Sequence, residues 1–164
     1  MQSVSWEDPK FTRNVLDMRK ALMILLLFIA GVAFAQDELH WETNFEKAQE
    51  SAKANSKFIL MSFQGSDWCA NCRRLEKTLF ESEEFKKLAK EKFVLLKLDF
   101  PVKKQNKLPK EQAAYNDKMA EKYNKTGSFP KVLIFDNQGN QKGEMALASP
   151  MLDAYLKSLN TLIN

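Results

Sequence analysis

The sequence has few cysteine and histidine residues, which bind zinc, and few glycines and prolines, which interrupt regular structure. Its 164 residues include two cysteines, one histidine, five glycines and five prolines. With 45% hydrophobic and 28% charged residues, this composition excludes a fibrous or disordered chain and is typical of one globular domain. Structural zinc takes four ligands, and the cysteines with His40 supply only three without dimerisation. We therefore expect no metal site.

A hydrophobic run long enough to cross a membrane is also missing. The apolar stretch Ala21–Phe34 has about 14 residues, whereas a span needs roughly 20. It follows two basic residues and ends in a small-x-small pattern, so residues 18–35 are interpreted as a secretory signal peptide cleaved near Ala35. The alternatives are an uncleaved signal that tethers the protein to the membrane, or a buried core helix. Gly31 and the polar residues after Ala35 argue against both.

Residues 1–17 carry Glu7, Asp8 and Asp17 where a basic leader is expected. Our hypothesis is that translation begins at Met18 and that these residues are a dispensable leader, so that residues 36–164 form the domain. Without residues 1–35 the net charge falls from +4 to +3, because four basic and three acidic residues are lost. This excess is too small to indicate nucleic-acid binding, and the lysines alternate with glutamates as on solvated helix faces. We expect no nucleic-acid partner and no stable membrane span in the mature chain.

Hydrophobic periodicity predicts an alternation of helices and strands. In the first half we expect a helix at 42–55, a strand at 57–63, a helix after the cysteines that continues or restarts at Ser82, and a strand at 93–99. In the second half we expect a helix at 112–123 ended by Gly127, strands at 130–136 and 141–148, and a last helix capped near Ser149-Pro150. The first two strands form a β-α-β unit, which implies a parallel pair with a right-handed crossover. Residues 101–111 are basic and contain two prolines. They predict an exposed loop, either an ordinary insertion or a docking loop for a partner.

The two cysteines lie in the stretch SDWCANC, at the turn between a buried strand and a helix. A disulfide between positions three apart closes a small ring and removes little entropy from the unfolded chain, so structural stapling is a poor explanation. Reversible redox chemistry is the better one. The helix N-terminus should lower the pKa of Cys69 and make it the nucleophile, and Cys72 should resolve the mixed disulfide.

The sequence resembles the thioredoxin-like family. The stretch WCANC at 68–72 is similar to the family's WCxxC site, and GSFP at 127–130, before a strand, is similar to its cis-proline loop. The similarity extends from about Asn44 to Leu159. It implies an α/β three-layer fold with a central mixed sheet of about four strands flanked by helices, and a thiol–disulfide oxidoreductase activity without a cofactor.

The resemblance also implies a substrate-binding surround of Trp68, Phe129 and Pro130. Pro130 would be cis and pack against the disulfide, although a proline at the start of a strand is usually trans. Phe129 would offer backbone groups to an extended substrate. Trp68 would cover the site, unless it is a core residue.

Two departures from the family pattern concern the chemistry. Ser62 stands where cytoplasmic thioredoxins have a buried Asp, so the proton acceptor for Cys72 is Glu76 or a water, although a salt-bridging role explains Glu76 better. The dipeptide Ala70-Asn71 is neither the Gly-Pro of typical thioredoxins nor a histidine-containing pair of strong oxidases. The sequence therefore assigns no redox potential, and it favours a reductant or an isomerase.

These observations together predict an exported, periplasmic thiol–disulfide oxidoreductase that acts on protein disulfides and is re-reduced by a membrane-bound electron donor. The alternative is a redox-inert binding module that holds a client protein against Phe129 and Pro130. The basic loop at 101–111 and the missing buried Asp keep that alternative open. Peroxide reduction at Cys69 lacks a supporting arginine and threonine surround.

Overall fold

The computed structural model describes residues 38–164. The predicted leader at 1–17 and the predicted signal peptide at 18–35 lie outside the described residues. Among the helices from residue 38 onward, none combines the length and the apolar character that a membrane span requires.

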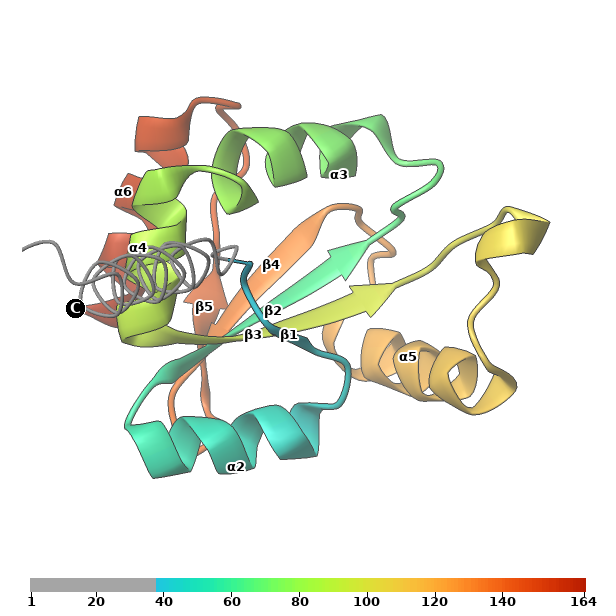
Figure 1. Ribbon diagram of the computed structural model, residues 1–164, viewed down its shortest axis with the longest axis horizontal. Coiled ribbons are helices and arrows are strands. Elements are labelled where there is room, and N and C mark those ends of the chain that lie inside the picture. The colour runs from blue at the N-terminus through green and yellow to red at the C-terminus, as the bar shows by residue number, and fades with distance from the viewer. Residues whose placement is uncertain (1–37) are drawn as a thin grey trace, which may run out of the picture. The chain divides into compact units, whose positions relative to one another are not determined.

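A five-stranded mixed sheet forms the centre of the domain, with the strand order β1-β3-β2-β4-β5 (Figure 1). The strands are β1 (Trp41–Glu42), β2 (Phe58–Gln64), β3 (Phe93–Asp99), β4 (Lys131–Phe135) and β5 (Gln141–Glu144). β2 runs parallel to β3 and antiparallel to β4. Because Phe63 near the end of β2 pairs with Lys131 at the start of β4, the segment after β2 and the segment before β4 emerge at the same edge of the sheet.

Helices cover both faces of the sheet (Figure 1). One face carries α3 (Ala70–Leu75), which continues into a π-helical turn, η1 (Glu76–Phe80), together with α4 (Glu83–Lys92) and α6 (Leu152–Ile163). The other face carries α2 (Phe45–Asn55) and α5 (Lys110–Tyr123), and a single 3-10 turn, η2 (Lys104–Asn106), lies in the loop before α5. This arrangement confirms the expected three-layer α/β fold.

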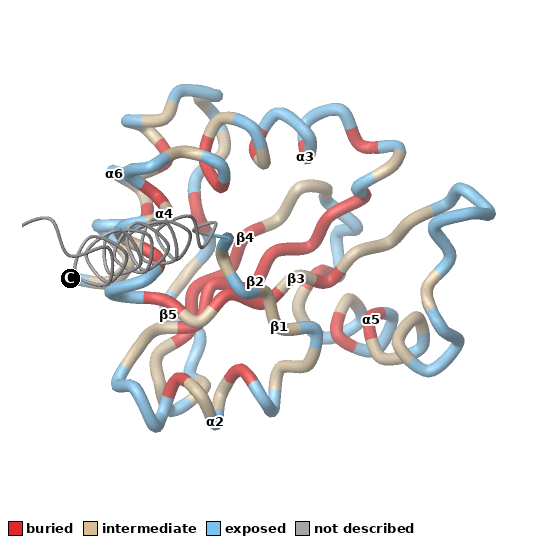
Figure 2. Tube along the Cα trace, viewed as in Figure 1, coloured by how far each residue is buried: buried red, intermediate tan, exposed pale blue. Residues whose placement is uncertain are grey.

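The core has one hydrophobic cluster on each face of the sheet, and β2 contributes to both. Leu60 belongs to the cluster under α3, α4 and α6, whereas Ile59, Met61 and Phe63 belong to the cluster over α2 and α5. A strand covered on both faces is apolar at successive positions rather than at alternate ones, as the run FILM at the start of β2 is. Figure 2 shows this central strand as an almost continuous buried segment.

The structure corrects the start of the first predicted helix. The predicted helix at 42–55 begins only at Phe45, with Asn44 as its cap, and the residues before it form the additional strand β1 beside β3. Two residues are too few to show an alternating pattern, so the sequence predicted about four strands and the sheet has five. Ser82 does cap α4, since its Oγ accepts a hydrogen bond from Phe85 N at 3.2 Å, as expected for a restart.

The expected cap of the last helix at Ser149-Pro150 is wrong. α6 begins at Leu152 after Met151, and no side chain caps it. The preceding strand ends at Glu144 instead of Ala148, because the chain then leaves the sheet and Ala146 N donates to Ser158 Oγ of α6 at 2.9 Å. The residues that sequence periodicity placed in a strand and a cap therefore form this crossing.

Candidate redox site

The two cysteines form a disulfide at the point where β2 has ended and α3 begins. Cys69 is the N-cap of α3, and its Sγ accepts a hydrogen bond from Cys72 N at 3.1 Å. Cys69 is 6% exposed and Cys72 is 1% exposed. Cys69 is therefore the sulfur that a partner reaches more easily, and Cys72 lies beneath it.

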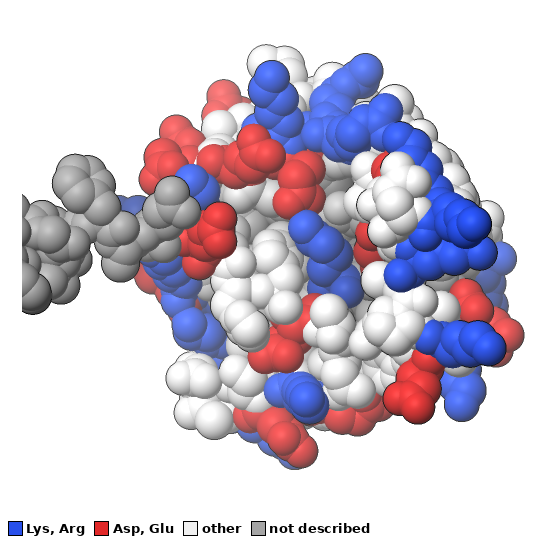
Figure 3. Space-filling model, turned by 45° about the vertical axis from the view of Figure 1, so that its right-hand side comes forward, with Lys and Arg blue, Asp and Glu red and all other residues white. Residues whose placement is uncertain are grey.

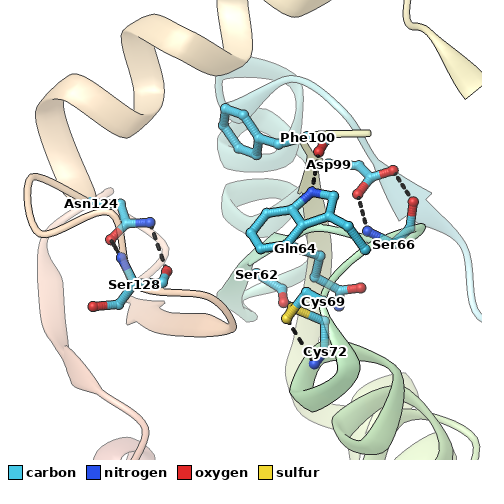
Figure 4. Close-up of a disulfide and its surroundings, with 10 residues drawn as sticks. Ser62, Gln64, Ser66, Cys69, Cys72, Asp99, Phe100, Asn124 and Ser128 are labelled. Carbon is cyan, nitrogen blue, oxygen red and sulfur yellow. Dashed lines mark hydrogen bonds between the residues drawn. A yellow bond between two sulfur atoms is a disulfide. The ribbon is translucent and has the colours of Figure 1, made fainter. Parts of the chain in front are cut away.

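The turn before Cys69 is fastened to the end of β3 (Figure 4). Ser66 donates to the Asp99 carboxylate from both its backbone N, at 2.8 Å, and its Oγ, at 2.5 Å. Trp68 Nε1 donates to the Phe100 carbonyl oxygen at 2.7 Å. The backbone of the turn closes on itself, since Cys69 N donates to the Gly65 carbonyl oxygen at 2.8 Å. Cys69 is thus held by contacts on both sides of the turn.

Asp67 extends this attachment into the loop that follows β3. Its carboxylate accepts hydrogen bonds from Val102 N at 3.0 Å, Lys103 N at 2.9 Å and Asn106 Nδ2 at 3.0 Å. Desolvation alone would raise the pKa of Asp67, but these hydrogen bonds and the charge of Lys103 together lower that pKa below its ordinary value. The carboxylate is therefore ionised at neutral pH and anchors the loop.

The Phe129–Pro130 peptide bond is cis, as the family resemblance implied. The loop before it is positioned by Asn124, which is 4% exposed. Asn124 Nδ2 donates to the Ser128 carbonyl oxygen at 2.9 Å, and Asn124 Oδ1 accepts from Ser128 N at 3.1 Å. α5 ends at Tyr123 with Asn124 as its cap, so Gly127 lies in the turn beyond, at a φ of +62°, and does not itself end the helix as predicted.

Aromatic side chains join the cysteine turn to the proline loop. The ring centroids of Trp68 and Phe129 are 5.3 Å apart, and Phe129 lies at the same distance from Phe100, in an edge-to-face arrangement in both pairs. Trp68 is 44% exposed and hence is not a core residue. Sequence reasoning missed Phe100. Its position directly after a buried strand parallel to β2 was the available signal, because parallel strands end at the same edge of a sheet.

A cavity of about 330 Å³ opens beside the proline loop. Its walls come from α3, the proline loop, the segment before α6 and α6 itself, and include Asn71, Arg74, Phe129, Pro130, Leu147 and Tyr155. Burial raises the pKa of Tyr155, and the positive charge of Arg74 opposes this shift. The cavity therefore has apolar residues in its wall and one cationic side chain, Arg74, from the helix that Cys69 caps.

Two uncharged polar side chains of β2, Ser62 and Gln64, lie beside the disulfide (Figure 4). Ser62 is fully buried and Gln64 is 3% exposed, and Gln64 Nε2 donates to Ser62 Oγ at 3.0 Å. No aspartate or glutamate is buried among residues 38–164. Glu76 is engaged elsewhere, because Lys97 Nζ contacts its two carboxylate oxygens at 3.0 and 3.2 Å. The salt-bridging interpretation of Glu76 is confirmed.

Comparisons with known proteins give matches to thioredoxin-like proteins and to a disulfide bond reductase. A thioredoxin-like family model matches residues 40–137. The disulfide bond reductase DsbH of Chlamydia pneumoniae is 32% identical over 129 residues, which cover 79% of this chain and 75% of that protein. The structure of a DsbH oxidoreductase superimposes with a TM-score of 0.68 at 31% identity, over 77% of this chain and 85% of the other. A thioredoxin from Thermus thermophilus shares the fold, with a TM-score of 0.57 at 16% identity, over 76% of this chain and 87% of its own.

Proposed function

Because the chain belongs to the thioredoxin-like family, we propose that it is an exported thiol–disulfide oxidoreductase that reduces or isomerises disulfides in other proteins. The observation that carries the proposal is the disulfide between Cys69 and Cys72 at the start of α3, after a turn whose Trp68 packs against Phe129 of the cis-proline loop. The similarity of the chain to a protein described as a disulfide bond reductase supports reduction as the direction of the reaction.

The first step is attack by the Cys69 thiolate on one sulfur of a client disulfide. A new bond forms between Cys69 Sγ and that sulfur, the client disulfide breaks, and the other client sulfur leaves as a thiolate that takes up a proton. Cys72 N, which donates to Cys69 Sγ at 3.1 Å, supports this step because a hydrogen bond to a charged sulfur is stronger than one to a neutral sulfur. The greater exposure of Cys69 supports the attacking role that we propose for it.

The second step releases the client. The Cys72 thiolate attacks Cys69 Sγ, re-forms the disulfide and expels the second client thiol, so that two electrons pass from the protein to the client. In isomerisation, a thiol of the client itself attacks the mixed disulfide before Cys72 does. Reduction needs a dithiol donor to restore the cysteines, and for an exported protein we assign this role to a membrane-bound donor.

Ser62 and Gln64, which are both uncharged, are poor acceptors for the proton that Cys72 must lose. A buried carboxylate in this position would act as a general base, whereas a hydroxyl and an amide exchange protons poorly at neutral pH. Water that reaches Cys72 in the reduced protein is therefore the acceptor that we propose. Trp68, Phe129 and Pro130 form the surface on which an extended client segment would lie.

Equilibration of the purified protein with glutathione and dithiothreitol buffers tests the proposal. We expect a reversible two-electron couple closer to about −270 mV than to about −120 mV, the values typical of a reductant and of a strong oxidant. A Cys72→Ser variant should accumulate mixed disulfides with clients, and a Cys69→Ser variant should not. A pair that does not exchange, or client binding that persists when both cysteines become serine, would instead favour a redox-inert binding module.

A further inference from the structure

The loop between β3 and α5, residues 100–109, is a built part of the site's rim. Asp67 binds two backbone N–H groups of this loop and the Asn106 side chain, and Trp68 binds its first carbonyl group. Asn106 N also donates to the Lys103 carbonyl oxygen at 3.0 Å within η2. The loop is thus held at a fixed place next to Trp68, and its side chains extend the surface that a client meets.

Lysines dominate the outer side of this loop. Residues 100–110 contain Lys103, Lys104, Lys107 and Lys110 and no acidic residue. Within the described part of the chain, no ion pair joins Lys104, Lys107 or Lys110 to a carboxylate. Figure 3 shows lysine and arginine side chains gathered on the right-hand side, the side on which this loop lies in Figure 1.

An apolar hollow of about 360 Å³ lies between the loop and α5. Phe100, Pro101, Val102, Leu108 and Ala113 line it, and Val102 is 65% exposed. Lys107 stands at its loop side, and Asp99 and Asp117 stand at its other borders. Asp99 is already bound by Ser66, so Asp117 is the carboxylate that marks the α5 side. The hollow therefore has a basic side and an acidic side.

We propose that the hollow binds a large apolar side chain of the client protein, and that acidic residues next to it in the client pair with Lys104, Lys107 and Lys110. This inference rests on the proposed function and names the client class: disulfide-bonded proteins with an apolar residue beside aspartate or glutamate near the cysteine. Charge complementarity selects this occupant, because among residues 38–164 no ion pair neutralises Lys104, Lys107 or Lys110. The hollow between them and α5 is lined largely by apolar residues, which suit an apolar side chain.

Matched peptides test the inference. Each carries one cysteine in a mixed disulfide with 2-mercaptoethanol, and a Leu-Glu-Glu, Leu-Gln-Gln or Leu-Lys-Lys segment near the cysteine. Reduced protein should reduce the acidic peptide about tenfold faster than the neutral one at low salt, the lower end of the range for electrostatic steering. The preference should nearly vanish at about 1 M salt, where the screening length is only about 3 Å. Replacing leucine by serine in the acidic peptide should slow its reduction, because the apolar side chain for the hollow is then missing.

Two triple variants locate the effect. Lys104→Gln, Lys107→Gln and Lys110→Gln together should abolish the preference for the acidic peptide. The control set, Lys53→Gln, Lys87→Gln and Lys92→Gln, removes the same charge from exposed positions on α2 and α4 and should retain it. Equal losses in both sets would mean that net charge rather than the loop is responsible, and equal rates for all peptides with the native protein would also overturn the inference.

Two further readouts separate this inference from the proposed function. All variants should reduce the small neutral 2-hydroxyethyl disulfide at the native rate, and failure of the native protein to do so would refute the proposed function. Fluorescence anisotropy of labelled peptides with serine in place of cysteine measures docking without any reaction. Stronger binding of the acidic peptide that is lost only in the Lys104, Lys107 and Lys110 triple variant supports the inference even if reduction fails. Equal binding of all peptides refutes it.

Discussion

Substitution of Gly65 by alanine tests how the turn before Cys69 is packed. A Cβ atom at Gly65 would collide with Cε2, Cζ2 and Nε1 of the Trp68 indole. The indole has little freedom to move, because Nε1 donates to the Phe100 carbonyl oxygen at 2.7 Å and the ring packs edge-to-face against Phe129. Gly65→Ala must therefore displace Trp68 from both contacts.

The size of the effect follows from three contributions. Overpacking costs about 1–3 kcal/mol, and losing a neutral hydrogen bond costs about 0.5–1.5 kcal/mol. In the opposite direction, alanine restricts the unfolded chain and stabilises by about 0.4–1 kcal/mol, since Gly65 does not occupy the left-handed region. We expect a net loss of about 0.5–4 kcal/mol in the free energy of unfolding. In a Trp68→Ala background the two costs disappear, and Gly65→Ala should be neutral or stabilising by up to about 1 kcal/mol.

Urea unfolding followed by far-UV circular dichroism measures this change of sign. The native protein, the two single variants and the double variant form one thermodynamic cycle, and the coupling between Gly65 and Trp68 is the difference between the two effects of Gly65→Ala. Equal effects of Gly65→Ala in both backgrounds would refute the reasoning. That result would mean that the indole moves away from the new methyl group at no cost, and that its contacts with Phe100 and Phe129 do not hold it.

Two other residues give direct tests of the buried and the exposed parts of the site. Ser62→Ala leaves Gln64 Nε2 buried without a partner and should lower the free energy of unfolding, measured with urea, by about 1–3 kcal/mol. The double variant Ser62→Ala with Gln64→Leu should lose less, because no buried amide is then left without a partner. A double variant at least as unstable as the single one would contradict this. The pKa of Asp67 is lowered in the folded protein. The stability that its hydrogen bonds contribute is therefore present above pH 3.8, the ordinary pKa, and is lost as the pH falls through the lower pKa of the folded state. The amide NMR signals of Val102 and Lys103 should therefore titrate together with a midpoint below 3.8, and Asp67→Asn should remove this step; a midpoint at or above 3.8 would count against the assignment.

The chemistry of the site was predictable because it lies in two short motifs. WCANC and the Phe129-Pro130 dipeptide are local in sequence, and the strand at 93–99 was predicted with the bounds that it has, because both of its sides are covered by protein. The cap at Ser82 was likewise a local signal. Features of this kind depend on neighbouring residues, which a single sequence displays directly.

The missed features depend on partners distant in sequence. The attachment of Asp67 to the loop joins residues 35 to 39 positions apart, and nothing around Asp67 distinguishes it from a solvated turn residue. Asn116 is similar: it is 2% exposed in the middle of a polar helix, where its Nδ2 donates to the Asp99 carbonyl oxygen at 2.8 Å. Burial of such a residue follows from where α5 packs, and helical periodicity reports only that the helix is amphipathic.

The antiparallel pairing of β2 with β4 has a consequence for the order in which the site is assembled. The cysteines are separated by a single helical turn and can meet early in folding, whereas the pairing of Phe63 with Lys131 closes a loop of about 70 residues, which costs more chain entropy. Contacts of such high sequence separation form slowly. A newly made chain is therefore expected to have an oxidisable cysteine pair before the surface that we propose for clients has been assembled around it.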